Sequence, residues 1–260
     1  MTLRSDVCDL PDVGELFDVC DACPTSAQAC GVRDNGAMSP PPRASRTYGG
    51  VPAAVRVARR RDQFLEAGLE LFGTAGYSST SVRAVCREAG LSERYFYESF
   101  ESTEALLIGV YQRCTDVMHD EMLVALSGTD LDPATTPDAV ERVVRTTLEA
   151  VFASIADPRV LRVCWLEILG VGPAVDATYI AGIDRFAGTV AVLIAGLYDI
   201  EIDERLRLVA TALVGAVMTT AVRWYLDGQT EPVSTLVDAN AIVFAGVAAQ
   251  LGESIPQRGD

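Results

Sequence analysis

The sequence predicts an all-α protein, and three observations support this fold class. From Ala58 onward, apolar residues recur at intervals of three and four, which is the period of one face of an α-helix. The alternation of apolar and polar residues that is typical of a half-buried strand does not occur. Proline and glycine residues divide the apolar runs into segments of helical length.

Residues 1–55 show no sustained periodicity, and we interpret them as a leader or disordered extension. Residues 39–50 are rich in proline, glycine, serine and arginine, a composition that favours turns. Met38 precedes this run, so residues 1–37 are either a translated leader or the result of a misassigned start. No basic-then-apolar export signal begins the sequence, and a cytoplasmic location is the expectation.

Ordered structure is expected to begin near Arg56, and the first predicted helix ends at Gly76, which can adopt the left-handed conformation that terminates helices. Its apolar face consists of Phe64, Ala67, Gly68, Leu71, Phe72 and Ala75. The second helix begins after Thr80 or Ser81, either of which can cap its first turn. Its inward face consists of Val82, Val85, Cys86 and Ala89.

The residues Ala89-Gly90-Leu91-Ser92 join this second helix to a short third one. The spacing is that of a helix-turn-helix over about residues 81–100. Gly90 permits the tight bend, and Ser92 caps the third helix, whose Phe96 and Phe100 point inward. A fourth helix is capped by Ser102 and runs to about residue 126.

Five further helices are expected at residues 137–156, 158–170, 173–198, 203–227 and 233–251. The longest uninterrupted apolar stretches are Phe186–Tyr198, of 13 residues, and Leu208–Val222, of 15 residues. Because a membrane span needs about 20 residues, we expect both stretches to lie within a protein core and expect no membrane partner.

The run from Phe72 to Leu107 resembles the DNA-binding domain of the TetR family of transcriptional regulators. The resemblance rests on the "LF…GY" of the first helix, the "T-S-V-R" that starts the second, the "A-G-L-S" turn, and the "Y-x-x-F" that ends the third. It implies a DNA-binding domain at residues 56–110 and a helical ligand-binding and dimerisation domain at residues 111–255.

The resemblance also implies contacts with double-stranded operator DNA. Thr80 and Arg83 would reach phosphates from the second helix, while Arg94 and Tyr95 would contact bases or backbone and Tyr97 a phosphate. The family usually has a small residue where Arg94 stands, threonine where Tyr95 stands, and lysine where Thr103 stands, so the reading face here is bulkier. Ser92 is a further expected contact.

Charge is distributed unevenly along the chain, whose net charge is −15. Residues 33–61 carry seven arginines and one acid, whereas residues 111–260 carry 21 acids and ten arginines. The chain has no lysine, so every cationic phosphate contact must come from arginine. Arg59, Arg60 and Arg61, which we place just before the first helix, are expected to supply that charge, unless they are a solvated helix start.

Residues 111–227 are expected to enclose a cavity for a small-molecule effector. The candidate lining residues are Tyr111, Met118, Met122, Phe152, Arg162, Trp165, Leu166, Tyr179, Ile183 and Phe186, and any of the apolar ones could instead be core. Arg162 and Glu167 could orient a polar group, pair with each other, or face solvent. His119, beside Asp116, Asp120 and Glu121, is interpreted as part of a solvated helix face rather than a metal ligand.

By family resemblance, the last two helices would pair with their twofold mates in a homodimer. The expected interface residues are Leu206, Val209, Leu213, Val217, Trp224, Leu236 and Val243. Two reading helices would also bind two half-sites, which one short helix could not do with useful affinity.

The leading hypothesis is a ligand-released repressor with no enzyme activity, cofactor or metal. The alternative is a redox or metal sensor that uses the four N-terminal cysteines, Cys8, Cys20, Cys23 and Cys30, beside the same DNA-binding domain. The other three, Cys86, Cys114 and Cys164, are expected to be small core residues. Effector, operator, target genes and the choice between repression and activation lie beyond the sequence.

Overall fold

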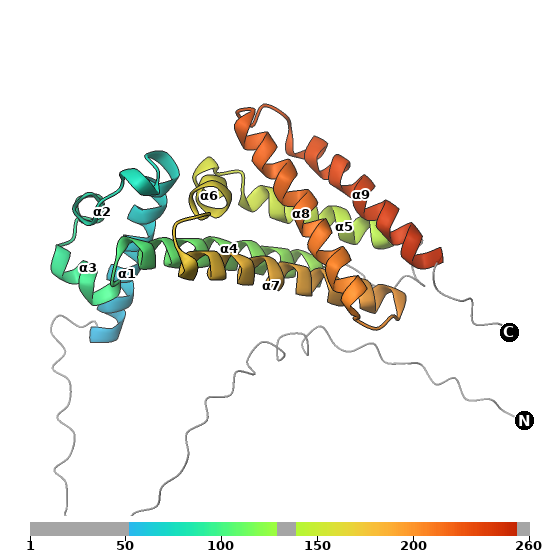
Figure 1. Cartoon of the computed structure of the whole chain (residues 1–260), viewed down its shortest axis with the longest axis horizontal. Helices are drawn as coiled ribbons and strands as arrows, with labels where there is room; N and C mark the ends of the chain where they lie inside the picture. Colours follow the sequence, from blue (N-terminus) through green and yellow to red (C-terminus); the bar gives the residue numbers. More distant parts are fainter. Residues whose placement is uncertain (1–51, 129–138, 254–260) are drawn as a thin grey trace, which may run out of the picture. The chain divides into compact units, whose positions relative to one another are not determined.

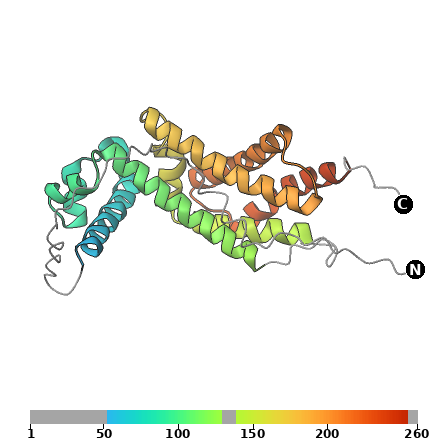
Figure 2. The same ribbon diagram turned by 90° about the horizontal axis from the view of Figure 1, so that it is seen from below.

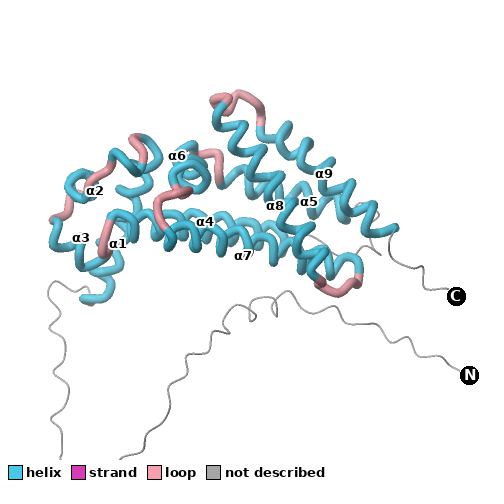
Figure 3. The backbone as a smooth tube through the Cα atoms, viewed as in Figure 1, coloured by secondary structure: helices cyan, strands magenta, loops and turns pink. Residues whose placement is uncertain are grey.

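A computed structural model describes residues 52–128 and 139–253, all of which belong to the compact unit that spans residues 49–260. The described residues form helices joined by turns and loops and contain no strand, as the sequence predicts (Figures 1 and 3). The N-terminal cysteines and the proline-rich run lie outside the described residues. The elements, in chain order, are α1 (Ala53–Thr74), η2 (Tyr77–Ser79), α2 (Val82–Ala89), α3 (Glu93–Ser99), α4 (Thr103–Ser127), α5 (Ala139–Ser154), α6 (Pro158–Arg162), η3 (Val163–Glu167), α7 (Pro173–Tyr198), α8 (Glu204–Leu226) and α9 (Val233–Glu253).

Helices α1, α2 and α3 form a small three-helix unit around an aromatic core. The Phe64 ring meets the rings of Phe96 and Phe100 edge to face, with centroids 5.5 and 6.4 Å apart. Ser81 caps α2 by accepting a hydrogen bond from the Ala84 amide, and Gly90 ends it at φ 65°. The helix-turn-helix is therefore fixed by the aromatic spacing and the caps that the sequence indicates.

Helix α4 links this three-helix unit to the C-terminal half of the chain, which consists of α5 to α9. In that half, α4 packs against α5 and α7 (Figure 2). Helix α5 packs in turn against α9, and α7 against α8. Phe152, Ile155 and Leu161 are fully buried at the centre of this half. Cys86, Cys114 and Cys164 are buried, which confirms them as core residues.

Several element boundaries differ from the prediction. Helix α1 begins at Ala53, so Arg59, Arg60 and Arg61 lie inside it rather than before it. Ser92 stands at the N-terminus of α3 but makes no side-chain capping bond. The helix expected at residues 158–170 is instead the short α6 followed by η3, a single π-helical turn, a feature that often marks functional positions.

Gly76 has positive φ, but at φ 93° and ψ 154° it is extended rather than in the left-handed helical conformation that we predict. A β-carbon here would stand 2.9 Å from an Arg162 guanidinium nitrogen and 3.1 Å from a Glu167 carboxylate oxygen. Glycine is therefore required both by the backbone angle and by the approach of these two side chains.

Helices α7, α8 and residues 233–251 of α9 are long and apolar enough to cross a membrane, judged by length and composition. The expectation that no segment reaches that length is therefore wrong. The predicted apolar stretches are bounded by charged residues, but the helices do not stop there. Helix α7 continues through Arg185 and α8 through Arg207, so each helix is longer than its apolar stretch. Much of the apolar surface of these helices is exposed in the single chain, including Ile180, Leu208 and Ile242.

Candidate nucleic-acid interface and ligand cavity

Helix α3 presents a bulky polar surface because its one buried residue, Phe96, fixes its orientation. The Arg94 side chain is 84% exposed, and the rings of Tyr95 and Tyr97 also face outward. From α2, the Arg83 side chain is 88% exposed. The structure thus brings Arg83, Arg94, Tyr95 and Tyr97 together on one surface, and an arginine with two tyrosines suits contact with phosphates and base edges.

Arg60 and Arg61 both contact α3 from α1. The Arg60 guanidinium lies 4.3 Å from the centroid of the Tyr95 ring, a cation–π contact. The Arg61 guanidinium donates a hydrogen bond of 2.9 Å to the Ser99 carbonyl and lies over the Phe100 ring. Arg60 therefore belongs to the α3 surface, while Arg61 mainly holds α3 in place.

A carboxylate lies between Arg60 and Arg94 on this surface. Arg94 Nε donates a hydrogen bond of 3.1 Å to Glu98 Oε1, and Arg60 Nη2 lies 3.6 Å from Glu98 Oε2. Sequence reasoning missed Glu98, although its position four residues after Arg94 is the spacing at which helical charges pair.

The remaining predicted DNA contacts lie at element ends. Thr80, half-buried, donates its hydroxyl to the Gly76 carbonyl at 2.9 Å, so its oxygen remains able to accept a bond. Ser92 is exposed, and Thr103 is the half-buried first residue of α4. Ser102, just before it, caps α4 by accepting from the Ala105 amide.

The second half encloses an apolar cavity of about 130 Å³. Among the predicted ligand contacts, those that line it are Tyr111, Met118, Met122, Trp165, Ile183 and Phe186. Further lining residues come from α5, α8 and α9, among them Val144, Leu213 and Phe244. The sequence carries no signal for these, because an apolar cavity wall and a core have the same composition and period.

Four other predicted ligand contacts lie elsewhere, and one of them, Leu166, is exposed. Phe152 is fully buried in the core. Tyr179 packs against the Tyr111 ring and is not part of the cavity wall. Arg162 turns toward the helix-turn-helix unit, where Glu167 balances its charge. Of the alternatives left open for Arg162 and Glu167, pairing with each other is the one that the structure shows, at 2.9 Å.

This Arg162–Glu167 pair joins η3 to the end of α1. Arg162 Nη1 donates a hydrogen bond of 2.6 Å to the Thr74 carbonyl. Glu167 Oε2 accepts one of 2.8 Å from the Tyr77 amide. Between these two side chains, Cys164 and Trp165 line the apolar cavity. One helical turn therefore contacts both the cavity and the helix-turn-helix unit.

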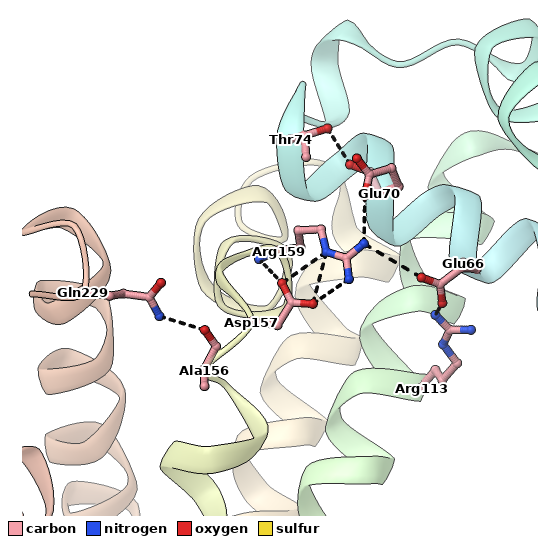
Figure 4. Close-up of polar contacts among 8 residues, drawn as sticks. All are labelled: Glu66, Glu70, Thr74, Arg113, Ala156, Asp157, Arg159 and Gln229. Atoms are coloured by element: carbon pink, nitrogen blue, oxygen red, sulfur yellow. Dashed lines mark hydrogen bonds and ion pairs between the residues drawn. The ribbon is translucent and has the colours of Figure 1, made fainter. Parts of the chain in front are cut away.

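A second polar cluster joins α6 to the middle of α1, as Figure 4 shows. Arg159 donates to Asp157 Oδ2 at 2.6 Å and to Glu70 Oε2 at 2.7 Å. Glu66 of α1 also accepts from Arg113 of α4 at 2.9 Å. The guanidinium of Arg159 holds the pKa of the Asp157 carboxyl below its ordinary value. The contact is close enough that a β-carbon on Gly73 would stand 2.4 Å from that of Arg159.

His119 does not lie on a solvated face. It is half-buried between α4 and α7, where Nε2 lies 3.0 Å from the Thr189 hydroxyl and the ring meets Phe186 edge to face. Burial and the nearby Arg185 lower the pKa of its imidazole. Within residues 52–128 and 139–253, no group of three histidine, cysteine or acidic side chains could hold a metal ion.

Most of the predicted dimer contacts face the interior of the single chain. The buried ones are Leu206, Leu213, Trp224 and Leu236; Val209 and Val217 are half-buried, and Val243 is exposed. The predicted face of α8 is therefore the inward one. The outward face carries Leu208 and Leu226 on α8 and Ile242 on α9, which are 62%, 65% and 74% exposed.

Residues 64–110 match the sequence model of the family described as bacterial regulatory proteins, tetR family. No curated protein sequence matches the chain. The fatty acid degradation regulator FadR from Bacillus halodurans is similar in structure, with a TM-score of 0.60 at 16% identity, over 71% of this chain and 94% of its own. FadR from Bacillus subtilis, solved in complex with stearoyl-CoA, gives 0.61 at 16% identity, over 70% and 96%.

A TetR-like transcriptional regulator from Rhodococcus sp. RHA1 is similar over 79% of this chain and all of its own, with a TM-score of 0.52 and 23% identity. At these identities the structural likeness concerns the fold. It is the all-α fold with an N-terminal helix-turn-helix unit and a helical C-terminal domain.

Proposed function

Since residues 64–110 identify the chain as a TetR-family transcriptional regulator, we propose that it is a cytoplasmic, homodimeric repressor that leaves its operator when an apolar small molecule binds. The observation that carries the proposal is the path from cavity to DNA-binding unit. A single π-helical turn supplies Trp165 to the cavity wall, while Arg162 and Glu167 at its two ends bind the backbone of α1 and η2.

The surface of α3 supports sequence-specific DNA binding by this chain. Arg94 can form paired hydrogen bonds with a guanine edge or a phosphate, and Tyr97 can donate its hydroxyl to a phosphate. Thr80, Arg83, Ser92 and Thr103 stand around it as further candidate contacts. Tyr95, held by Arg60, offers an apolar ring to a thymine methyl group.

The apolar cavity supports release by a ligand. A molecule that fills it displaces the Trp165 side chain or fixes its position, and both effects are transmitted to Arg162 and Glu167 along one helical turn. FadR from Bacillus subtilis, which is similar in fold, was solved in complex with stearoyl-CoA, a ligand with a long apolar chain. By linkage, operator DNA must weaken ligand binding by the same factor.

The outward apolar face of α8 and α9 supports a homodimer. Exposed apolar patches of this kind usually mark an interface, and a twofold pair would bury Leu208, Leu226 and Ile242. The same association would cover much of the apolar surface that makes these helices resemble membrane spans. It would also present two α3 helices to successive major grooves.

The proposal is tested by measuring, at several salt concentrations, how tightly the protein binds the DNA upstream of its own gene. We expect a steep salt dependence that corresponds to about 6–10 released counterions for a dimer. The double variant Arg94→Ala/Tyr95→Ala should lose sequence preference. Arg145→Ala on α5, where the side chain is 40% exposed and paired with Asp238, is the control that removes one positive charge elsewhere. Unchanged preference in the double variant would show that α3 does not read the operator.

A further inference from the structure

A polar hollow of about 490 Å³ adjoins the apolar cavity between α4 and α7. The two spaces share three wall residues, Tyr111, Thr115 and Gly182. The other wall residues of the hollow are Gln112, Asp116, Ala177, Thr178, Ala181 and Arg185. The ends of a single elongated molecule could therefore meet two different environments, one almost entirely apolar and one polar.

Size supports the joint use of both spaces. At about 130 Å³, the apolar cavity is close to the engineered cavities of ~150 Å³ that hold benzene. Ligand sites for larger molecules usually measure about 300–1,000 Å³. The polar hollow alone reaches that range, so a ligand of ordinary size has to extend into it.

Tyr111 stands at the junction of the two spaces. A β-carbon on Gly182 would lie only 2.2 Å from the Tyr111 hydroxyl oxygen, so the ring end rests directly on the backbone of α7. Its hydroxyl donates a long hydrogen bond of 3.4 Å to the Tyr179 carbonyl. A bond of that length is weak, so the position of the ring is set mainly by its packing against Tyr179 and α7.

The charges of the hollow cancel. Arg185 Nη1 lies 2.5 Å from Asp116 Oδ1, so one cation and one anion face each other across α4 and α7. A ligand head with negative charge would meet a guanidinium whose charge Asp116 already neutralises.

The hydroxyl groups of the hollow can accept hydrogen bonds but have no free hydrogen to donate. Thr115 already donates to the carbonyls of Tyr111 and Gln112, and Thr178 donates to the Ala174 carbonyl at 2.9 Å. Their oxygen lone pairs and the Asp116 carboxylate accept hydrogen bonds from a ligand, while the Gln112 amide and the Arg185 guanidinium can also donate to it. Hydroxyl and amide heads donate hydrogen bonds, whereas a carboxylate does not.

We propose that the effector is an amphiphile with an uncharged, hydrogen-bond-donating head, which lies in the polar hollow while its apolar chain passes Tyr111 into the cavity. This inference rests on the proposed function and deepens it, because it names the chemical class of the ligand. A polyanionic head such as that of stearoyl-CoA would find no net positive charge in the hollow of this chain.

The test compares two ligands with one chain length, decan-1-ol and decanoate, at pH 8, where the carboxylate is fully ionised. Binding is followed by the tryptophan fluorescence of the full chain without DNA, in which Trp165 of the cavity wall is read after Trp224 is replaced by Phe. We expect decan-1-ol to bind at least about tenfold more tightly than decanoate. Equal affinities, tighter binding of decanoate, or no binding of either ligand would overturn the proposal.

Two variants test whether the Asp116–Arg185 pair determines the preference for decan-1-ol over decanoate. In Asp116→Asn, Arg185 loses its partner, so decanoate should gain affinity and the preference should shrink severalfold, while Arg185→Gln should widen it. Asp238→Asn on α9 breaks a similar exposed pair, with Arg145, outside the hollow and should leave the preference unchanged. A preference that ignores Asp116→Asn would show that the head does not lie there.

The two proposals can fail separately. If decan-1-ol binds with the expected preference but does not release DNA, the ligand site stands and the repressor mechanism falls. If DNA is bound and released by some ligand while decan-1-ol and decanoate show no preference, the mechanism stands and the assignment of the head falls.

Discussion

Glu98 lies between Arg60 and Arg94 on the surface that we propose for DNA, and it neutralises part of their charge in the free protein. Phosphates and this carboxylate would compete for the same guanidinium groups. The arginines must therefore exchange one anionic partner for another when DNA arrives. Because the ion pairs with Glu98 must be broken, the affinity for DNA should be lower than the number of arginines suggests.

Glu98→Gln is expected to strengthen DNA binding by about twofold to tenfold at low salt, with a smaller gain at high salt. Titrations with operator DNA at several ionic strengths measure the effect. Glu149→Gln, an exposed residue on α5, provides the same change of net charge away from α3. An equal gain in both variants would assign the effect to net charge rather than to the release of Arg60 and Arg94.

Asp157 gives the fold a dependence on acid. Its pKa is lowered in the folded chain, first by the hydrogen bonds from the Arg159 side chain. A carboxyl with a depressed pKa stabilises the fold above its ordinary value of 3.8, and that stability is lost as pH falls through the folded pKa. Thermal melts of the parent and Asp157→Asn should thus differ at pH 6, and the difference should shrink as the pH falls below 3.8. A constant difference would contradict this linkage.

At the scale of elements, the π-helical turn η3 connects the cavity wall to α1 through Arg162 and Glu167. Glu167→Gln keeps the shape of the side chain but removes the charge that holds Arg162 and the Tyr77 amide. We expect ligand to bind as before and to release DNA severalfold less effectively. DNA titrations with and without ligand give the coupling factor.

The matched control for Glu167→Gln is Glu141→Gln on α5, which also breaks a pair with an arginine at 2.9 Å. It should leave the coupling factor unchanged. Full release of DNA by ligand in Glu167→Gln would mean that the signal reaches α1 by another route.

Two glycine-to-alanine substitutions should change the free energy of unfolding in opposite directions, one at the contact between α1 and α6 and one at an open position on α7. Gly73→Ala places a β-carbon 2.4 Å from that of Arg159, so the two helices must separate, at a cost of about 1–3 kcal/mol. Gly188→Ala on α7 has no neighbour within 4 Å and should raise stability by up to ~1 kcal/mol through helix propensity. Chemical unfolding measures both changes. A harmless Gly73→Ala would contradict the close packing of α1 and α6.

The elements show where sequence reasoning succeeds and where it stops. The helix-turn-helix follows from local signals, because Ser81, Gly90 and the Phe96–Phe100 spacing each have one structural meaning. The orientation of α8 does not follow from them. Leu206 and Leu208 are both apolar, yet one is buried and the other 62% exposed, since both sides of this helix are apolar and periodicity alone cannot tell core from interface.

The same limit applies to the candidate cavity. Met118 and Phe152 both fit an inward helical period, yet one lines the cavity and the other belongs to the solid core. Only the three-dimensional packing separates them. The position of Arg162 does not follow from the sequence for a different reason, because its partner Thr74 lies almost ninety residues earlier in the chain, as does Tyr77, whose amide donates to Glu167.

At the scale of the whole molecule, self-association is the property that decides whether two α3 helices can act together. Ile242→Glu puts a charge on the outward face of α9, at a side chain that is 74% exposed in the single chain. We expect it to shift the protein toward monomer and to weaken operator binding at least about tenfold. Sedimentation velocity and DNA titration measure the two effects.

Val124→Glu on α4 is the control for Ile242→Glu, because its side chain is 72% exposed and lies outside α8 and α9. It should remain associated to the same extent as the parent. If Ile242→Glu stays dimeric at low concentration, the interface must lie on another face.

The walls of the apolar cavity include Leu213 and Val217 from the inner side of α8 and Phe244 from α9. The outer sides of the same two helices carry Leu208 and Ile242. A ligand in the cavity would therefore contact the inner sides of α8 and α9, whose outer sides form the proposed dimer interface. The dimerisation equilibrium and effector binding should therefore be thermodynamically linked. The effector concentration that releases DNA should change with the concentration of the protein.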